Sequence, residues 1–271
     1  MTILETIVSH KRTEIASRKV GLPLPALLGG LSDAQPPRNF AEALVSSARP
    51  APRVIAEIKR RSPSKGALRP ELDPVELARI YEQNGASAIS VLTDQRFFGG
   101  SLDDLRAVRM STALPLLRKD FVVDPYQVYE ARISGADAIL LIAAILTTEQ
   151  IASYGALAAE LGMAALVEVH NQAEMTSALN AKASLIGINN RDLHTFNVTL
   201  DTTRALRPLI PPGTILVSES GIHTEADRES LRMLGVDALL IGESLLVSAD
   251  VAQATRLMCG LAPPVSERSV A

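Results

Sequence analysis

The sequence is poor in the residue types that several classes of protein depend on. It has no tryptophan and one cysteine, Cys259, which excludes an internal disulfide or a metal site built from several thiolates and fits a reducing compartment. No apolar run approaches the roughly 18 uncharged residues of a membrane-spanning helix, and the N-terminus lacks the apolar core of a signal peptide. We therefore expect a cytoplasmic protein that does not bind membranes.

Nucleic-acid binding is disfavoured for a related reason. The basic segment KRRSPSK (59–65) resembles a nucleic-acid patch when it is considered alone. However, aromatic residues form 3% of the chain and the formal net charge is −3. The chain therefore offers few aromatic rings on which bases could stack and no overall positive charge that would attract phosphates. We expect no nucleic-acid partner.

What the chain does contain is a hidden repeat. Four stretches each place a glycine after a helix-like segment and before an alanine-rich and then strongly apolar run: NGASAISVL (84–92), SGADAILLI (134–142), LGMAALVEV (161–169) and LGVDALLIG (234–242). Glycine suits the left-handed position that ends a helix. The spacings lie near multiples of about 25 residues, which is room for one strand and one helix.

Filling in the missing units gives eight apolar runs separated by helical segments. The runs start near Val54, Ser87, Leu114, Asp137, Ala164, Ser184, Thr214 and Val236. Asp73-Pro74 and Asp124-Pro125 resemble an N-cap followed by proline, and Thr224 with Asp227 gives a looser start signal. Strict alternation predicts a parallel sheet, and eight units favour a closed (β/α)8 TIM barrel over an open doubly wound sheet. No G-x-G-x-x-G follows the first run, which weakens the dinucleotide-binding alternative.

Both ends of the chain lie outside this repeat. Residues 1–50 show a helical apolar stripe, then a connector rich in proline and glycine, then Asn39 and Glu42 as a capping pair. We expect an N-terminal helical extension at 1–50 packed on the barrel, a catalytic barrel at 51–261, and a frayed C-terminal tail at 262–271.

Charged residues end several of the apolar runs, where a barrel of this kind gathers its catalytic groups. Alternation along a strand places Lys119 on the face of Leu117, Glu168 on that of Leu166 and Asn189 on that of Gly187, and Glu57 shares a face with Lys59. One such residue would be a solvated rim residue. Five converging at matched parity predict a functional site, because unpaired buried ions cost several kcal/mol each.

Other polar residues receive structural interpretations. Arg118 and Asp120 are expected to face the helices as buttressing salt bridges, and His170 is assigned to the face opposite Glu168 with a structural or rim role.

The loops after runs seven and eight resemble phosphate loops, with backbone amides at Ser220, Gly221, Gly242 and Glu243. The side chain of Glu243 is expected to point away from the phosphate.

Several motifs, in this order and spacing, resemble the indole-3-glycerol-phosphate synthase family of tryptophan biosynthesis. They are EIKRRSPSKG (57–66), SVLTDQRFFGGSLDDL (90–105), LLRKDFVVDPYQ (116–127), ALVEVH (165–170), GINNRDL (187–193), SESGI (218–222) and IGESLL (241–246). The resemblance implies a carboxy-lyase that uses no cofactor or metal. The implied reaction closes the ring of 1-(2-carboxyphenylamino)-1-deoxyribulose 5-phosphate and releases carbon dioxide and water.

The resemblance also implies roles for individual residues. Lys119 is similar to the general acid, Glu168 to the general base or proton shuttle, and Asn189 to a group that orients hydroxyls. Lys59 would offset substrate charge or act as a second acid, with Glu57 tuning it. The implied substrate contacts are Ser62, Pro63, Phe121, Arg191 and Ser220, with Ser220, Gly221, Gly242 and Glu243 at the phosphate.

Three other functions stay open at this point. One is a non-catalytic phosphosugar-binding barrel, the second an isomerase acting on the preceding pathway intermediate, and the third a Schiff-base aldolase. The isomerase would require a cysteine base near the first strand, whereas the one cysteine of the chain, Cys259, lies in the last helical segment. As partners we expect a small phosphosugar-anthranilate substrate, a monomer or weak homo-oligomer, and association with other tryptophan-pathway enzymes.

Overall fold

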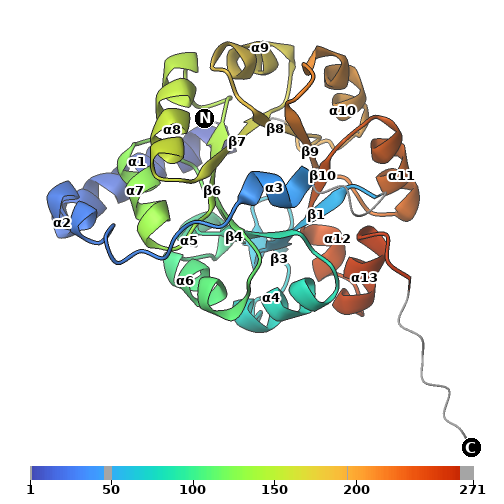
Figure 1. The fold of residues 1–271 in the computed structure, drawn as a ribbon, viewed down its shortest axis with the longest axis horizontal. Helices are drawn as coiled ribbons and strands as arrows, with labels where there is room; N and C mark the ends of the chain where they lie inside the picture. The colour runs from blue at the N-terminus through green and yellow to red at the C-terminus, as the bar shows by residue number, and fades with distance from the viewer. Residues whose placement is uncertain (1, 46–50, 194, 263–271) are drawn as a thin grey trace, which may run out of the picture.

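Eight parallel strands close into a barrel, and helices surround it (Figure 1). The computed structural model describes residues 2–45, 51–193 and 195–262. The barrel strands are β1 (Arg53–Ile58), β4 (Ala88–Leu92), β5 (Leu116–Lys119), β6 (Ala138–Ile142), β7 (Ala164–Val169), β8 (Leu185–Asn189), β9 (Ile215–Glu219) and β10 (Ala238–Ile241). Their order round the barrel is β1-β10-β9-β8-β7-β6-β5-β4, so each strand pairs with the barrel strands before and after it in the sequence, and the pairing of β1 with β10 closes the ring. The predicted (β/α)8 barrel is confirmed.

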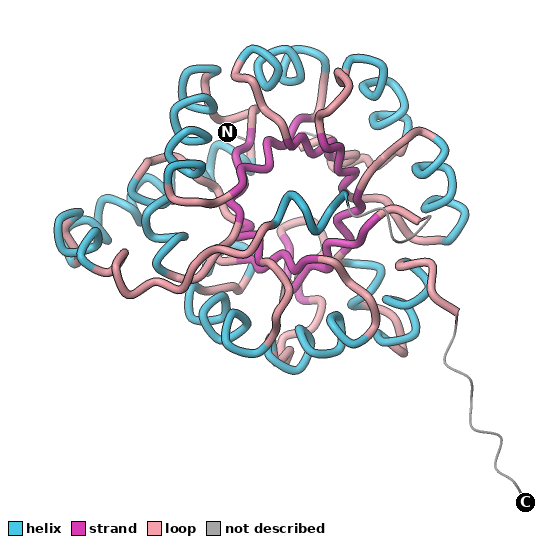
Figure 2. The backbone as a smooth tube through the Cα atoms, in the orientation of Figure 1, coloured by secondary structure: helices cyan, strands magenta, loops and turns pink. Residues whose placement is uncertain are grey.

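One helix follows each barrel strand and packs on its outer face (Figure 2). In chain order these are α4 (Pro74–Gln83), α6 (Leu102–Ser111), α7 (Tyr126–Ile133), α8 (Thr148–Glu160), α9 (Gln172–Asn180), α10 (Asp201–Leu206), α11 (Glu225–Met233) and α13 (Val251–Met258). Shorter pieces in the connections are α5 (Gln95–Phe98), the 3-10 helix η1 (Arg207–Leu209), α12 (Glu243–Leu246) and a hairpin of β2 (Arg61–Ser62) and β3 (Gly66–Ala67).

The predicted helix starts depend on side-chain caps. Asp73 accepts hydrogen bonds from the backbone of Val75 and Glu76 at 2.8 and 3.3 Å, and Thr224 forms a full capping box with Asp227. At α7 the helix begins one residue later than expected. Asp124 still accepts a hydrogen bond from the backbone N–H of Tyr126 at 2.9 Å, so it caps the helix from one position before the N-cap residue, which is Pro125.

Alternation along the strands divides the core into two layers. One face contributes Ile55, Leu117, Leu166 and Val217 to the barrel interior. The other face packs against the helices, with residues such as Val54, Ile89 and Ile186. Because this parity holds to the strand ends, the polar residue two positions after each interior residue is directed toward the barrel mouth.

The N-terminal segment contacts the barrel in two places. Helix α3 (Phe40–Val45) lies across the N-terminal end, where Phe40 and Leu44 join the interior layer (Figures 1 and 2). Helices α1 (Ile3–Gly21) and α2 (Leu24–Gly29) project at one side, where Ile15 and Leu27 pack against Tyr126 of α7.

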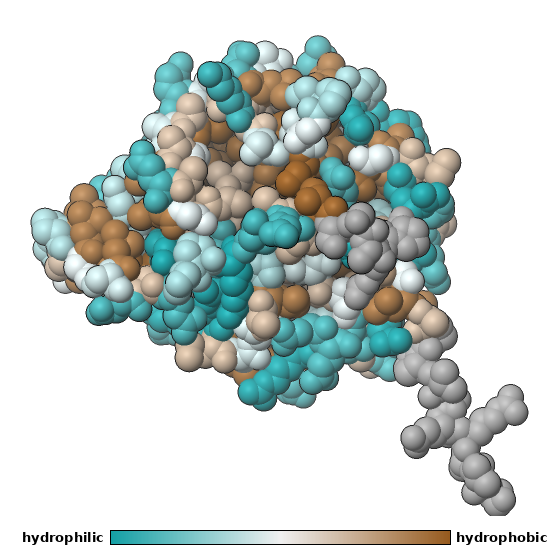
Figure 3. Space-filling model, viewed as in Figure 1, coloured by the Kyte–Doolittle hydropathy of each residue, from teal (hydrophilic) through white to brown (hydrophobic). Residues whose placement is uncertain are grey.

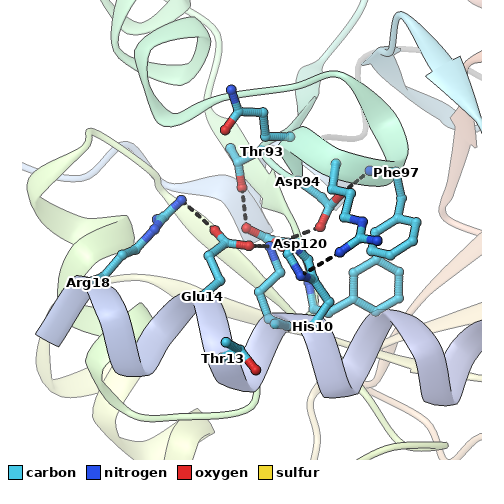
Figure 4. Close-up of polar contacts among 12 residues, drawn as sticks. His10, Thr13, Glu14, Arg18, Thr93, Asp94, Phe97 and Asp120 are labelled. Carbon is cyan, nitrogen blue, oxygen red and sulfur yellow. Dashed lines mark hydrogen bonds and ion pairs between the residues drawn. The ribbon is translucent and has the colours of Figure 1, made fainter.

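A buried ion-pair cluster fixes α1 to the barrel. The ammonium of Lys11, fully buried, lies 3.0 Å from a carboxylate oxygen of each of Glu14, Asp94 and Asp120, which converge above α1 (Figure 4). Asp120 also pairs with Arg118 at 3.1 Å. Arg118 and Asp120 thus form the buttressing salt bridge that the sequence predicted on the helix-facing side.

Some boundaries remain predictions. The division of the chain after residues 50 and 261 follows the repeat count, and most of the predicted frayed tail, residues 263–271, lies outside the described residues. Among the helices that the structure describes, none combines the length and apolar character that crossing a bilayer requires.

Candidate active site

A pocket opens at the C-terminal ends of the barrel strands, as expected for this fold. It is lined by twelve of the thirteen residues that the sequence singled out: Glu57, Lys59, Ser62, Pro63, Lys119, Phe121, Glu168, Asn189, Arg191, Ser220, Gly242 and Glu243. Gly221 is not part of the lining. The parity argument therefore brought together side chains from strands far apart in the chain.

The first charged pair comes from β1 and the residue that follows it. Glu57, 5% exposed, accepts a hydrogen bond of 2.5 Å from the ammonium of Lys59. Gly242, at the end of β10, packs against this carboxylate, and a Cβ built there would lie 2.5 Å from Glu57 Oε1. Glycine is thus required at position 242 to leave room for the carboxylate of Glu57.

A second lysine lies deeper, among three strands. The ammonium of Lys119 on β5 donates to Glu168 of β7 at 2.7 Å and lies 3.3 Å from Glu219 of β9. Burial disfavours the ammonium, but the carboxylates of Glu168, Glu219 and Glu57 outweigh it and raise the pKa of Lys119. The group therefore keeps its proton at neutral pH.

The two carboxylates beside Lys119 differ in charge state. Burial raises the pKa of both, yet Lys119 and His170 together hold the pKa of Glu168 well below its ordinary value. For Glu219 burial dominates and the charge of Glu168 adds to it, so the pKa of Glu219 rises to about 8. At pH 7 the site thus holds an ionised Glu168 next to a protonated Glu219.

Glu219 is a site residue that the sequence analysis did not select. It ends the apolar run ILVSE and lies two residues after Val217, which faces the barrel interior. The parity rule used for Lys119 and Glu168 would have found it. The structure adds a second sign, because a Cβ on Gly187 of β8 would lie 2.2 Å from Glu219 Oε1.

An apolar wall faces these charges. Phe121, predicted from the sequence, has its ring centroid 5.9 Å from that of Phe98 in α5. The wall continues with residues that were not predicted, namely Ile3, Leu4 and Ile7 of α1 and Leu193 and Phe196 after β8. Nothing in the local sequence pattern indicated that α1 reaches the pocket, because its docking depends on Lys11 and distant carboxylates.

The polar rim is formed by the last residue of β8 and by residues that follow β1 and β8. Asn189, 9% exposed, accepts a hydrogen bond from the backbone of Arg191 at 3.0 Å. Ser62 lies on β2 and accepts from the backbone of Lys65 at 3.3 Å. Both residues are therefore held in the rim by contacts to the backbone beside them.

The two predicted phosphate loops have different geometries. Ser220 has φ +65° and lines the pocket, whereas Gly221 has φ +77° and a Cβ there would meet Val198 at 2.5 Å. Glu243 begins α12, and its carboxylate lies 3.6 Å from both Lys65 and Arg191. These two cations offset its charge, and its orientation relative to a phosphate stays a prediction.

The assignment of His170 to the face opposite Glu168 was wrong. Positions 168 and 170 are two apart and share a face, and His170 Nε2 lies 3.3 Å from Glu168 Oε1. On its other side, Nδ1 lies 2.9 Å from Glu174. The imidazole is therefore a neighbour of the site.

The chemistry that this arrangement supports is acid–base chemistry on an anionic substrate with an apolar part. Two ammonium groups can neutralise or protonate substrate oxygens, and Glu168 can accept a proton. Within residues 2–45, 51–193 and 195–262 no group of three or more His, Cys, Asp or Glu side chains has the arrangement of a metal site.

Comparison with known proteins gives a consistent family. The family model described as indole-3-glycerol phosphate synthase matches residues 4–258. A protein of that name from Dehalococcoides mccartyi (strain ATCC BAA-2100 / JCM 16839 / KCTC 5957 / BAV1) is 52% identical over 258 residues, covering 94% of this chain and 98% of that protein. Another, from Roseiflexus sp. (strain RS-1), is 50% identical over 267 residues, covering 96% and 98%.

One solved structure shows a likeness of fold at low sequence identity. A 3-hexulose-6-phosphate synthase from Salmonella typhimurium superposes with a TM-score of 0.64 at 15% sequence identity, covering 77% of this chain and 97% of that one. At this level of identity the similarity concerns the barrel and says nothing of the substrate.

Proposed function

This chain belongs to the indole-3-glycerol phosphate synthase family, and we propose on that premise that it converts 1-(2-carboxyphenylamino)-1-deoxyribulose 5-phosphate to indole-3-glycerol phosphate. The observation that carries the proposal is the contact of Lys119 with Glu168, 2.7 Å apart at the base of a pocket with an apolar wall. An acid and a base are thus adjacent where an aromatic substrate would lie.

The ring closure needs an acid first. The aromatic carbon that bears the carboxylate attacks the ketone carbon, and the ketone oxygen must take up a proton. Lys119 suits this role because its raised pKa keeps it protonated and because it lines the pocket. The carbon–carboxylate bond then breaks, its electron pair returns to the ring, and carbon dioxide leaves.

Dehydration completes the indole and needs a base. A proton leaves the intermediate while the new hydroxyl departs as water, so a carboxylate that is ionised at neutral pH is required. Glu168 fits, since its pKa is held low, and Asn189 beside it would orient the hydroxyl. Glu219, protonated at pH 7, could supply a proton to the departing hydroxyl.

The remaining residues would bind the substrate's two anionic ends and its ring. Lys59, held by Glu57, would offset the carboxylate that is lost or serve as a second acid. Pro63 and Phe121 would contact the aromatic ring, and Ser62 and Arg191 its polar groups. Backbone amides at Ser220, Gly221, Gly242 and Glu243 would hold the phosphate. No step requires a cofactor.

The direct test mixes the purified protein with the carboxyphenylamino-deoxyribulose phosphate and follows indole fluorescence. We expect turnover, and we expect Lys119→Ala and Glu168→Gln each to lose most of it while the circular dichroism spectrum is kept. Folded protein without a signal would favour a phosphosugar-binding barrel or an isomerase. Trapping of Lys119 or Lys59 by borohydride with a carbonyl substrate would favour an aldolase.

The setting in the cell is also a proposal. We infer a cytoplasmic enzyme from the reaction and from the absence of a membrane-spanning helix among the described helices. A monomer or weak homo-oligomer, and association with other tryptophan-pathway enzymes, are expected; sedimentation at several protein concentrations, alone and with those enzymes, measures both.

A further inference from the structure

The imidazole of His170 bridges two carboxylates at the edge of the pocket. His170 directly follows β7, and its Nε2 lies 3.3 Å from Glu168 Oε1 while its Nδ1 lies 2.9 Å from Glu174 Oε2. Its side chain is 9% exposed. The ring therefore connects the proposed base to a residue of helix α9, and it does so out of reach of most solvent.

Glu174 is itself held in place, which fixes the ring. One of its carboxylate oxygens accepts the backbone N–H of His170 at 2.8 Å, and the other accepts from the side chain of Asn171 at 2.6 Å. Asn171 in return caps the backbone N–H of Glu174 at 3.0 Å. With Nδ1 directed at this anchored acceptor, Nε2 has to face Glu168.

A purely structural role would be to complete the start of α9. The N-terminus of α9 is already capped without the ring, because the side chain of Asn171 and the backbone N–H of His170 donate hydrogen bonds to both carboxylate oxygens of Glu174, and Asn171 accepts the backbone N–H of Glu174. The approach of Nε2 to Glu168 adds nothing to the helix cap. It places the ring at ion-pair distance from the second oxygen of a carboxylate whose first oxygen is bonded to Lys119.

We propose that His170 is a positioning residue that keeps Glu168 ionised and oriented through the catalytic cycle, an inference that rests on the proposed function. In the resting site Glu168 has a cation at each oxygen, Lys119 and His170. When Lys119 gives its proton to the substrate, it loses its charge. The imidazolium of His170 is then the cation that remains in contact with Glu168 and stabilises its anionic form.

The charges around the pair agree with this role. The charged groups that face the imidazole are Glu168 of β7 and Glu174 of α9, and those that face Glu168 are Lys119 of β5 and Glu219 of β9. Burial opposes the cation, yet the two carboxylates outweigh it and raise the pKa of His170 to about 10. The ring is thus an imidazolium throughout the neutral range.

The first test measures the protonation of the ring by histidine NMR, independent of activity. The chain has four histidines, so the His170 signal is assigned by its loss in His170→Gln. We expect a ring that stays charged at pH 8 and above. A ring that titrates near the ordinary value of about 6.5 overturns the proposal.

The second test uses kinetics against pH. His170→Gln keeps a donor without charge, so the pKa of Glu168 should rise and the acid limb of kcat/KM should move up by about one pH unit, with kcat lowered about tenfold and KM little changed. Gln172→Ala, an exposed position in the same turn of α9, is the matched control and should match the wild type. A His170→Gln profile that superposes on the wild type overturns the proposal.

A third variant decides the matter if His170→Gln does not fold. Glu174→Gln keeps an acceptor for the ring but removes its charge, so the ring should lose its proton at a lower pH and the activity should fall at a correspondingly lower pH. An unchanged alkaline limb overturns the proposal. If the wild type itself lacks turnover, the proposed function fails. If the wild type is active and these variants have the same kinetics as the wild type, the function stands and the role of His170 fails.

Discussion

Replacing Lys11 by methionine tests how α1 is held to the barrel. Methionine keeps most of the apolar stem but removes the ammonium that lies 3.0 Å from each of Glu14, Asp94 and Asp120. Breaking a fully buried ion pair on one side typically costs about 3–5 kcal/mol, because the remaining charge is left without its partner.

The structure places the expected loss at the lower end of that range. Asp120 keeps Arg118 at 3.1 Å and the hydroxyl of Thr93 at 2.6 Å, and Asp94 still caps α5 through the backbone of Phe97 at 2.7 Å. Glu14 keeps its ion pair of 2.6 Å with Arg18, so all three carboxylates retain other partners. We expect the free energy of unfolding to fall by about 3 kcal/mol at pH 7.

The pH dependence of this loss has a definite sign. Burial raises the pKa of Asp120, but Lys11 and Arg118 outweigh it and hold that pKa below its ordinary value. The carboxylate therefore stabilises the fold above its unfolded pKa, and this contribution disappears as the pH falls through the folded pKa. Without Lys11 the folded pKa rises toward the unfolded value of about 3.9, so the deficit of the variant should shrink between pH 7 and pH 3, chiefly below about pH 5.

The assay is urea unfolding at these two pH values, with Lys19→Met as the control. Lys19 forms an ion pair of 2.7 Å with Asp124, but their side chains are 43% and 28% exposed, so its loss should cost less than about 1 kcal/mol. Equal losses in the two variants at pH 7, or a Lys11→Met deficit that does not shrink at pH 3, would refute the reasoning.

Three further predictions concern the pocket. Gly242→Ala should displace the carboxylate of Glu57 and lower kcat/KM at least about tenfold by the indole assay, whereas Gly155→Ala in α8, where nothing lies within 4 Å of the added Cβ, should stay active. Since the pKa of Glu219 is raised to about 8, the wild type should lose stability as the pH rises from 5 to 8, and Glu219→Gln should flatten that slope in urea titrations. Dialysis against EDTA should leave turnover unchanged, and a loss restored by a divalent metal would contradict a cofactor-free reaction.

The periodic part of the fold could be predicted from the sequence because each element carries local signals. Glycines such as Gly85 and Gly135, with φ of +95° and +88°, end helices, and caps such as Asp73 begin them. The alternation of side chains then placed Lys119 and Glu168 at one mouth. This inference needs no knowledge of which strands are neighbours beyond the closure of the barrel.

Other parts of the site depend on contacts that no local pattern encodes. The pocket residues Ile3 and Ile7 belong to an apolar stripe that is ordinary for an amphipathic helix. They reach the pocket because Lys11 forms ion pairs with Asp94 and Asp120, some 80 to 110 positions later in the chain. Glu219 and His170 were within reach of the alternation rule. Their electrostatic roles follow from distances to Lys119 and Glu174, which the sequence does not contain.

The position of the first 45 residues has a consequence for synthesis on the ribosome. Helices α1 and α3 are translated before β5, β9 and α7, the elements on which they rest. Until then the apolar side chains of Phe40, Leu44 and Ile15 lack the barrel residues that bury them. Leu24 and Leu28 stay exposed even in the finished protein, where apolar groups gather over α2 (Figure 3). The nascent chain must therefore expose these apolar side chains until the later strands and helices of the barrel have been made, and a chaperone that binds them during this period would limit aggregation.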